Sequence, residues 1–339
     1  MAPSAIDLPA EDGIASADTT ILSLRKCLVS EDSPLAARFR ALFSLKHLAS
    51  QSPPTSQTIP AIESIAAAFA SPSALLKHEL AYCLGQTRNF AAVPHLTQVL
   101  ENKTEDPMCR HEAAEALGAL GHEGSLALLK ELRDNTKEQV VVRETCEIAV
   151  ERIEWEHSTT KAQENLKGSD FASIDPAPPT SMLNRKSTAT DVTELEKTLL
   201  DDKLSLFIRY RAMFALRDLA SPPDLPTAVP AVHALAKGLA DKSALFRHEI
   251  AFVFGQLSHP ASIPALAECL GNQKEESMVR HEAAEALGSL GDEDGVEDVL
   301  KRFINDPEQV VRESIIVALD MAEFERAGEK EYATVPVAA

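Results

Sequence analysis

The sequence is poor in several residue types, and each shortage argues against a class of protein. Aromatic residues make up only 5% of the chain, with a single tryptophan, which is thin for a β-sandwich or barrel and favours helices. No apolar run reaches the length of about eighteen residues that a membrane helix needs, and the opening residues lack a basic stretch followed by an apolar one. We therefore expect neither secretion nor membrane insertion.

Cysteine and positive charge are also scarce. The five cysteines lie within helical patterns and show no C-x-x-C spacing, so we expect reduced thiols in a cytoplasmic protein. Lys and Arg number 33 against 52 Asp and Glu, and the formal net charge is -19. Such a charge repels nucleic acid and anionic membrane surfaces. No nucleic-acid or membrane partner is expected, and cationic partners are favoured.

The sequence repeats itself at two scales. LLKHELAYCLGQ from Leu75 returns as LFRHEIAFVFGQ from Leu245, and RHEAAEALGAL from Arg110 returns as RHEAAEALGSL from Arg280. Within each half, units recur at about 30 to 40 residues, the period of stacked two-helix repeats. Their apolar residues follow the helical period, and the pattern resembles that of HEAT repeats. We therefore predict an all-α protein, an α-solenoid of eight HEAT-like helical hairpins in two four-repeat halves.

The repeats also set the expected domain limits. We place an N-terminal four-repeat half at 17–156 and a C-terminal four-repeat half at 192–326. Residues 157–191 are rich in Ser, Thr, Asp and Pro without apolar periodicity, and we expect a flexible linker there. Residues 1–16 and 327–339 have a similar character and are expected to be loosely attached tails.

Four His-Glu dipeptides occupy equivalent positions in the second and third units of each half. One such pair alone would be an ordinary polar pair near a helix start, where a glutamate favours the helix dipole. Four in register are harder to explain in this way, because the chain has only 10 histidines and helix packing calls for small or apolar residues. The candidate metal ligands are His78 and Glu79, His111 and Glu112, His248 and Glu249, and His281 and Glu282.

The spacing of these dipeptides suggests how they meet a metal. Neighbouring helices pack about 8 to 10 Å apart, so two imidazoles one repeat apart can reach one ion, His78 with His111 and His248 with His281. A glutamate next to a histidine points about 100° away and can reach the ion of the opposite half if the halves face each other. Two histidines and one carboxylate with open positions are typical of oxygen-activating non-haem iron, whereas structural zinc closes four positions. Hydroxylation is the chemistry that this favours.

The segments around the four dipeptides resemble the His-Glu motifs of the deoxyhypusine hydroxylase family, and their order and the duplication match that family too. The resemblance implies an enzyme, a deoxyhypusine monooxygenase, with two Fe²⁺ ions between the halves and O₂ as co-substrate. Its substrate is deoxyhypusine, a lysine extended by an aminobutyl group, in the precursor of a translation factor. The reaction that the resemblance implies is the last step of hypusine formation.

The resemblance also implies the ligand sets, which are His78 and His111 with Glu249 on one iron and His248 and His281 with Glu79 on the other. The roles of Glu112 and Glu282 stay open at this point. They could be iron ligands, partners of the ligands or carboxylates that bind the substrate. We favour the last role, because a buried carboxylate makes charge-assisted hydrogen bonds with an amine. No catalytic residue is expected beyond the metal ligands.

Two alternatives belong to other classes. One is a non-catalytic HEAT-repeat scaffold whose concave face binds a partner protein. The other is a HEAT-type lyase that attaches a pigment, as in phycobiliprotein maturation, although nothing in that class requires four matched His-Glu pairs. Arg110 and Arg280, which lead their helices, are expected to be structural.

Overall fold

All regular structure that we describe is helical. The computed structural model describes residues 19–164, 166, 171–180 and 188–327. No β-strand occurs in these ranges, and the predicted all-α class is confirmed. Apart from Ala327, the predicted tails 1–16 and 327–339 lie outside the described residues. None of the described helices has both the length and the apolarity that crossing a bilayer requires.

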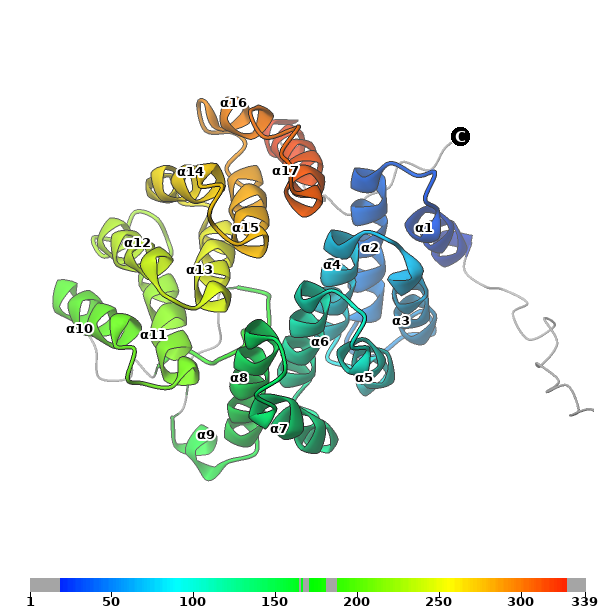
Figure 1. Cartoon of the computed structure of the whole chain (residues 1–339), viewed down its shortest axis with the longest axis horizontal. Helices are drawn as coiled ribbons and strands as arrows, with labels where there is room; N and C mark the ends of the chain where they lie inside the picture. Colours follow the sequence, from blue (N-terminus) through cyan, green and yellow to red (C-terminus); the bar gives the residue numbers. More distant parts are fainter. Residues whose placement is uncertain (1–18, 165, 167–170, 181–187, 328–339) are drawn as a thin grey trace, which may run out of the picture.

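The helices follow one another as hairpins, in which an outer helix precedes an inner helix (Figure 1). In the N-terminal half the outer helices are α1 (Thr19–Val29), α3 (Thr58–Ala66), α5 (Val93–Glu101) and α7 (Leu126–Asp134), and the inner helices are α2 (Leu35–Ala49), α4 (Ala74–Gly85), α6 (Pro107–Leu120) and α8 (Val140–Glu156). In the C-terminal half the outer helices are α10 (Ala189–Leu200), α12 (Ala228–Ala236), α14 (Ile263–Gly271) and α16 (Val296–Lys301), and the inner helices are α11 (Leu206–Leu219), α13 (Ala244–Leu257), α15 (Ser277–Gly288) and α17 (Gln309–Ala327). The short helix α9 (Thr159–Glu164) lies between the halves.

Side-chain caps determine where several inner helices begin, among them α4, α6 and α13. Ser73, Ser243 and Asp106 precede α4, α13 and α6, and each accepts a hydrogen bond from a backbone N–H of the first turn at 2.8 to 3.1 Å. Such caps satisfy N–H groups that have no partner within the helix. Pro107 takes the first position of α6, where its missing N–H costs nothing. The sequence thus starts these helices at equivalent places.

Small residues let neighbouring inner helices approach each other closely. A Cβ atom at Gly85 of α4 would lie 2.8 Å from the Cα atom of Ala116 in α6. A Cβ atom at Gly118 of α6 would lie 2.9 Å from the Cα atom of Ala149 in α8. Real Cβ atoms do not come so near to backbone, so only glycine permits this spacing. The stack of inner helices is therefore narrow.

The arginines that lead the inner helices have structural roles, as predicted. The Nε atoms of Arg110 and Arg280 donate to backbone carbonyls of the preceding outer helices, at 2.9 and 3.0 Å. Their guanidinium groups form paired hydrogen bonds with the carboxylates of Glu138 and Asp306. Each arginine therefore joins an inner helix to its outer partner and to the loop of the next repeat.

The inner helices close into a ring. Each packs beside the next within its half, and the halves meet where α8 packs beside α11 and where α17 packs beside α2. Two equivalent hydrogen bonds join the halves, from Ser73 Oγ to Glu313 Oε2 at 2.6 Å and from Ser243 Oγ to Glu144 Oε2 at 2.7 Å. The halves consequently face each other, as shared metal ligands require.

Part of segment 157–191 differs from the flexible linker that we expected. Besides α9, it contains residues 171–180, in which Asp175 is 8% exposed and Ala177 is fully buried. The Asp175 carboxylate binds the guanidinium of Arg217 in α11 through two hydrogen bonds, of 2.7 and 2.8 Å. A buried ion pair holds this stretch in place even though it has no apolar periodicity.

Candidate metal centre

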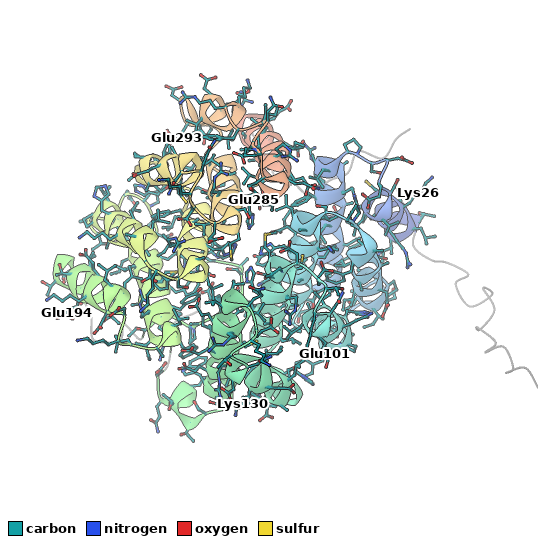
Figure 2. All side chains as sticks on the ribbon, in the orientation of Figure 1. Lys26, Glu101, Lys130, Glu194, Glu285 and Glu293 are labelled. Atoms are coloured by element: carbon teal, nitrogen blue, oxygen red, sulfur yellow. The ribbon has the colours of Figure 1, made fainter. Side chains whose placement is uncertain are left out.

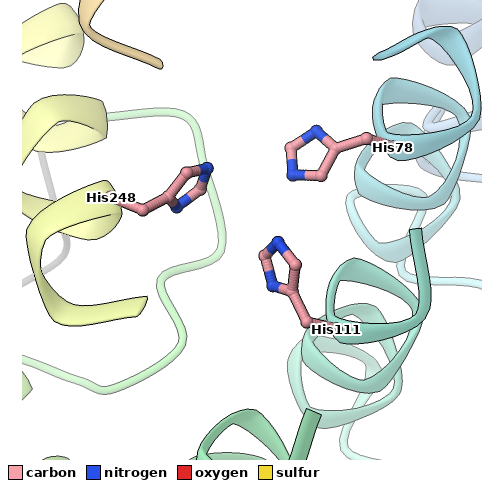
Figure 3. A group of neighbouring side chains, drawn as sticks. All are labelled: His78, His111 and His248. Atoms are coloured by element: carbon pink, nitrogen blue, oxygen red, sulfur yellow. The ribbon is translucent and has the colours of Figure 1, made fainter. Parts of the chain in front are cut away.

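The four predicted histidines meet in the middle of the ring. His78 of α4, His111 of α6, His248 of α13 and His281 of α15 are 0 to 4% exposed. Ring centroids lie 5.3 Å apart within each half and 5.2 to 5.6 Å apart across the halves. Figure 3 shows His248 pointing from its helix towards His78 and His111. They converge because each holds the same place in its repeat and the halves face each other.

The four predicted glutamates are buried beside the histidines. Glu79, Glu112, Glu249 and Glu282 are 2 to 7% exposed. In each half, the glutamate of the second dipeptide faces the histidine of the first. Oε2 of Glu112 lies 3.3 Å from Nε2 of His78, and the equivalent distance from Glu282 to His248 is 3.4 Å. The duplication in the sequence thus becomes a duplicated site.

Among the described residues, three groups of His and Glu side chains have ligand atoms within 4.8 Å of one another. They are His78, His111 and His248; His248, His281 and Glu282; and His111, Glu112 and Glu115. The first group draws on both halves. Glu79 and Glu249 are not in these groups, so their placement on the histidines of the opposite half stays a prediction.

The unpaired polar atoms of the site fit a metal. Within the part of the chain that is described, both ring nitrogens of all four histidines are buried without a hydrogen-bond partner, as is Oε1 of Glu249. Leaving buried polar atoms unpaired is costly, and folded proteins seldom do so without a reason. Imidazole nitrogens and carboxylate oxygens are ligands of divalent transition metals. A bound ion would satisfy these atoms together.

Comparisons with known proteins agree with this geometry. A family model described as HEAT repeats matches residues 62–150 and 232–320. A deoxyhypusine hydroxylase of Phaeosphaeria nodorum is 71% identical over 96% of this chain and 98% of its own length, and one of Neurospora crassa is 70% identical over 94% and 97%. The structure of human deoxyhypusine hydroxylase in complex with glycerol is 42% identical, with a TM-score of 0.79, over 93% of this chain and 99% of that one.

The chain belongs to the deoxyhypusine hydroxylase family. The predicted family, the HEAT-repeat fold and the enzyme class, a deoxyhypusine monooxygenase, are thereby confirmed. A high identity over nearly the whole chain leaves no support for the pigment lyase or for a scaffold without catalytic activity.

Burial and neighbouring charges shift the pKa values of His78, His111 and His281 in this hydroxylase. Burial lowers the pKa of His111 and of His281 well below the ordinary value, and His78 beside them lowers it further. Both rings are therefore neutral and keep a lone pair for a metal. Burial also lowers the pKa of His78, but Glu112 and Glu79 outweigh it, and the pKa is raised well above its usual value. The acidic surroundings thus favour a cation at the centre.

Sequence reasoning missed two carboxylates of the hydroxylase site. Glu115 and Glu285 lie one helical turn after His111 and His281 and line the same cavity as the predicted glutamates. Glu285 is labelled in Figure 2, and its Oε1 atom lies 3.6 Å from Nδ1 of His281 and accepts a hydrogen bond from Ser314 at 3.1 Å. The signal was present, since H-E-x-x-E occurs at equivalent places in both halves.

A cavity of about 200 Å³ gives access to the hydroxylase site. Aromatic and aliphatic side chains of α2, α4, α13 and α17 form much of its wall. The remaining wall is strongly acidic, because six carboxylates line it, those of Glu79, Glu112, Glu115, Glu249, Glu282 and Glu285. Such a cavity suits an aliphatic ligand that carries positive charge.

Proposed function

We propose that this chain hydroxylates the deoxyhypusine side chain in the precursor of the hypusine-containing translation factor, the last step of hypusine formation. It uses two Fe²⁺ ions and O₂ as co-substrate, and it acts in the cytoplasm. One observation carries the proposal. Four buried histidines from both halves converge with every ring nitrogen lacking a hydrogen-bond partner among the described residues, which is the state expected of metal ligands.

The proposed ligand sets are His78 and His111 with Glu249 for one ion, and His248 and His281 with Glu79 for the other. Two histidines and one carboxylate leave coordination positions open for other ligands. When bound, the two ferrous ions would supply the two electrons needed for one oxygen atom of O₂ to enter an aliphatic C–H bond while the other takes up two protons and leaves as water. The protein holds these six side chains on rigid helices and keeps bulk water away from them.

The substrate side chain fits the cavity in size and charge. Deoxyhypusine is an aliphatic chain with two amines, and we propose that Glu112 and Glu282 bind these amines through charge-assisted hydrogen bonds. The cavity volume of about 200 Å³ lies below the range of about 300 to 1,000 Å³ that is usual for small-molecule pockets. It therefore admits one extended side chain, while the body of the protein substrate stays outside.

Metal analysis and mass spectrometry test the proposal directly. The purified chain should contain about two iron ions, one for each two-histidine set. Incubation of the iron-loaded chain with the deoxyhypusine-containing factor, O₂ and a reductant should add one oxygen atom to that side chain. Iron-loaded protein that leaves the factor unchanged under these conditions would exclude the proposed activity.

Single substitutions locate the metal site. We expect His78→Ala and His248→Ala each to lose iron and turnover while the helical content, measured by circular dichroism, is largely retained, because each removes one ligand but no core packing group. His47→Ala is the matched control, since His47 is an exposed histidine of α2 outside the site. Full iron content in both ligand variants would show that these histidines do not bind the metal.

A further inference from the structure

The cavity does not share the two-fold relation of the ring. The duplication pairs α2 with α11, α4 with α13, α6 with α15 and α8 with α17, so an opening at one junction of the halves should recur at the other. The described wall of the cavity draws on α2, α4, α6, α13, α15 and α17, but on neither α8 nor α11. The cavity therefore lies towards the junction of α2 with α17 and not towards the junction of α8 with α11.

Two partly exposed residues of the cavity wall have counterparts at the other junction that are fully buried. Phe43 and Lys46 of α2 are half-buried, whereas their counterparts in α11, Phe214 and Arg217, are fully buried. Lys46 stacks over the rings of Phe43 and Tyr82, at 4.9 and 5.4 Å from their centroids. Something therefore covers the second junction that does not cover the first.

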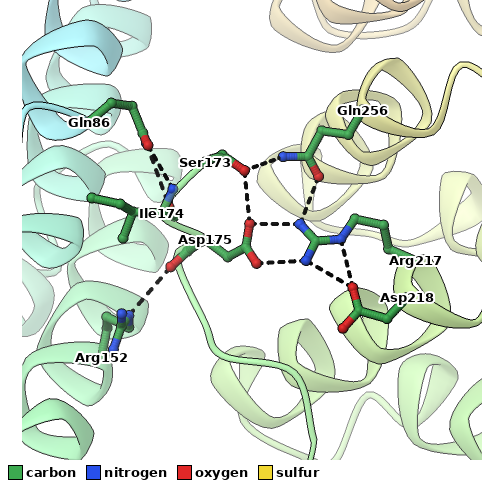
Figure 4. A network of polar contacts seen from close by, with 8 residues as sticks. All are labelled: Gln86, Arg152, Ser173, Ile174, Asp175, Arg217, Asp218 and Gln256. Carbon is green, nitrogen blue, oxygen red and sulfur yellow. Dashed lines mark hydrogen bonds and ion pairs between the residues drawn. The ribbon is translucent and has the colours of Figure 1, made fainter. Parts of the chain in front are cut away.

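The segment that joins the halves supplies this cover (Figure 4). Gln86 follows α4, its counterpart Gln256 lies in the last turn of α13, and both side chains form hydrogen bonds with the segment. The backbone N–H of Ile174 donates to Oε1 of Gln86 at 2.7 Å, and Nε2 of Gln256 donates to Oγ of Ser173 at 2.7 Å. The segment thus lies between the two halves, on the side of α8 and α11.

A buried ion pair completes this attachment. The Asp175 carboxylate binds Arg217, and the backbone oxygen of Asp175 accepts a hydrogen bond from Arg152 of α8 at 3.4 Å. Arg211 of α11 donates from its Nε atom to the backbone oxygen of Pro178 at 3.1 Å. Residues 173–178 therefore contact both helices whose counterparts border the cavity.

A second cavity lies on the side of the segment, and the segment separates it from the metal centre. It is lined by Ala119 and Arg152, the counterparts of Ser289 and Met321 in the wall of the first cavity, and by linker residues such as Ile174. Its described wall includes none of the eight His-Glu residues. On the side of α8 and α11, the segment that joins the halves therefore blocks access to the metal centre.

We propose that residues 173–178 close one of two equivalent openings of the ring, and that the deoxyhypusine side chain of a partner protein enters only through the other, between α2 and α17. This inference rests on the proposed function and deepens it. The metal centre is nearly two-fold, but its substrate is not, so a single opening makes every substrate approach from the same direction. The amines pass Lys46, the one lysine among the described residues of the cavity wall, and are attracted by the six carboxylates within.

A matched pair of cysteine variants tests which opening is used. Ser289 and Ala119 are small, half-buried counterparts that line the first and the second cavity. Ser289→Cys and Ala119→Cys are made in a Cys27→Ser background, because Cys27 is the one cysteine that is not buried. Each iron-loaded variant is labelled with N-ethylmaleimide, and its iron content, its affinity for the deoxyhypusine-containing factor and its turnover are measured against the unlabelled form.

We expect the label at position 289 to weaken binding and turnover at least about tenfold, and the label at position 119 to change them less than about twofold, with iron content unchanged in both. Full binding by labelled Ser289→Cys, or lost binding by labelled Ala119→Cys, would overturn the assignment of the opening. Failure of the proposed function is distinct from either result, because then the unlabelled variants and the parent chain would all fail to add oxygen, while the affinities would still report which opening the factor uses.

Discussion

Glu249 is 2% exposed, and its Oε1 atom has no hydrogen-bond partner among the described residues. Burial raises the pKa of this carboxyl well above its ordinary value, and the nearby Glu115 and Glu112 raise it further. Burial raises the pKa of Glu115 and of Glu285 in the same way. Ionising these groups without a counter-ion opposes folding, so the metal-free site costs stability that a bound cation restores.

The substitution Glu249→Gln should separate stability from metal binding. It keeps the shape of the side chain but removes a buried group that resists ionisation. We expect the metal-free chain to gain free energy of unfolding at neutral pH, because the amide is neutral and needs no counter-ion in the buried site. The same variant should bind less iron, because a carboxylate ligand has been lost.

Urea unfolding in the presence of a chelator, together with metal analysis, measures both effects. Glu101→Gln serves as the control, because Glu101 is exposed at the end of α5 and should change neither quantity. A metal-free Glu249→Gln chain that unfolds at a lower urea concentration than the parent would show that this carboxylate does not destabilise the metal-free fold.

At the residue scale the sequence was informative where a residue type was unexpected. A histidine is unusual on a packed repeat helix, so His78 and its three equivalents were predicted as ligands, and all four are buried together. A glutamate on a helix is ordinary, so Glu115 and Glu285 were overlooked although they repeat with the same spacing. Residue type alone does not show which face of a helix is buried, and here the acidic face lies inside the ring.

Among the elements, α4 and α13 connect the repeat fold to the metal centre. Their N-cap serines accept a hydrogen bond from the first helical turn and donate one to the other half, from Ser73 to Glu313 and from Ser243 to Glu144. A serine before a helical pattern predicts the cap. The acceptor could not be predicted, because Glu313 lies far along the chain and only the closure of the ring brings it near. One residue thus sets both the start of a helix and its placement across the interface.

Replacing this serine should affect metal binding as well as stability. We expect Ser73→Ala to lower the free energy of unfolding by about 1 kcal/mol, the usual effect of losing an N-cap, and also to weaken iron binding, because α4 is no longer tied to α17. Asp106→Ala removes the N-cap of α6, which makes no such bond to the other half, and should lower stability alone. Chemical unfolding and iron titration measure the two quantities. Equal iron affinities in the two variants would show that the bond to Glu313 does not position α4.

Across the whole molecule, internal repetition predicted the architecture but not its closure. The recurrence of Arg-led helices indicated two halves of stacked hairpins, because each repeat buries its apolar face against the next. The repeats do not specify that α17 packs against α2, because this contact depends on the curvature of the whole stack of helices. The joining segment was misjudged for a related reason. Ser173, Asp175 and Ala177 show no periodic pattern, and their fixed course depends on Arg217 and two glutamines in distant helices.

The ion pair between Asp175 and Arg217 therefore controls how firmly the segment joins the halves. In Asp175→Ala the guanidinium, 0% exposed, would lose its bidentate partner, and breaking a buried pair in this way costs about 3 to 5 kcal/mol. We expect a loss of about 3 kcal/mol in the free energy of unfolding by urea, at the low end of that range, because Asp218 and Gln256 still contact Arg217 at 3.0 and 2.9 Å. Combining Asp175→Ala with Arg217→Leu should recover most of the loss, since no charge then stays buried without a partner. An equal loss in the single and the double variant would mean that packing of the segment, and not its ion pair, holds the second opening closed.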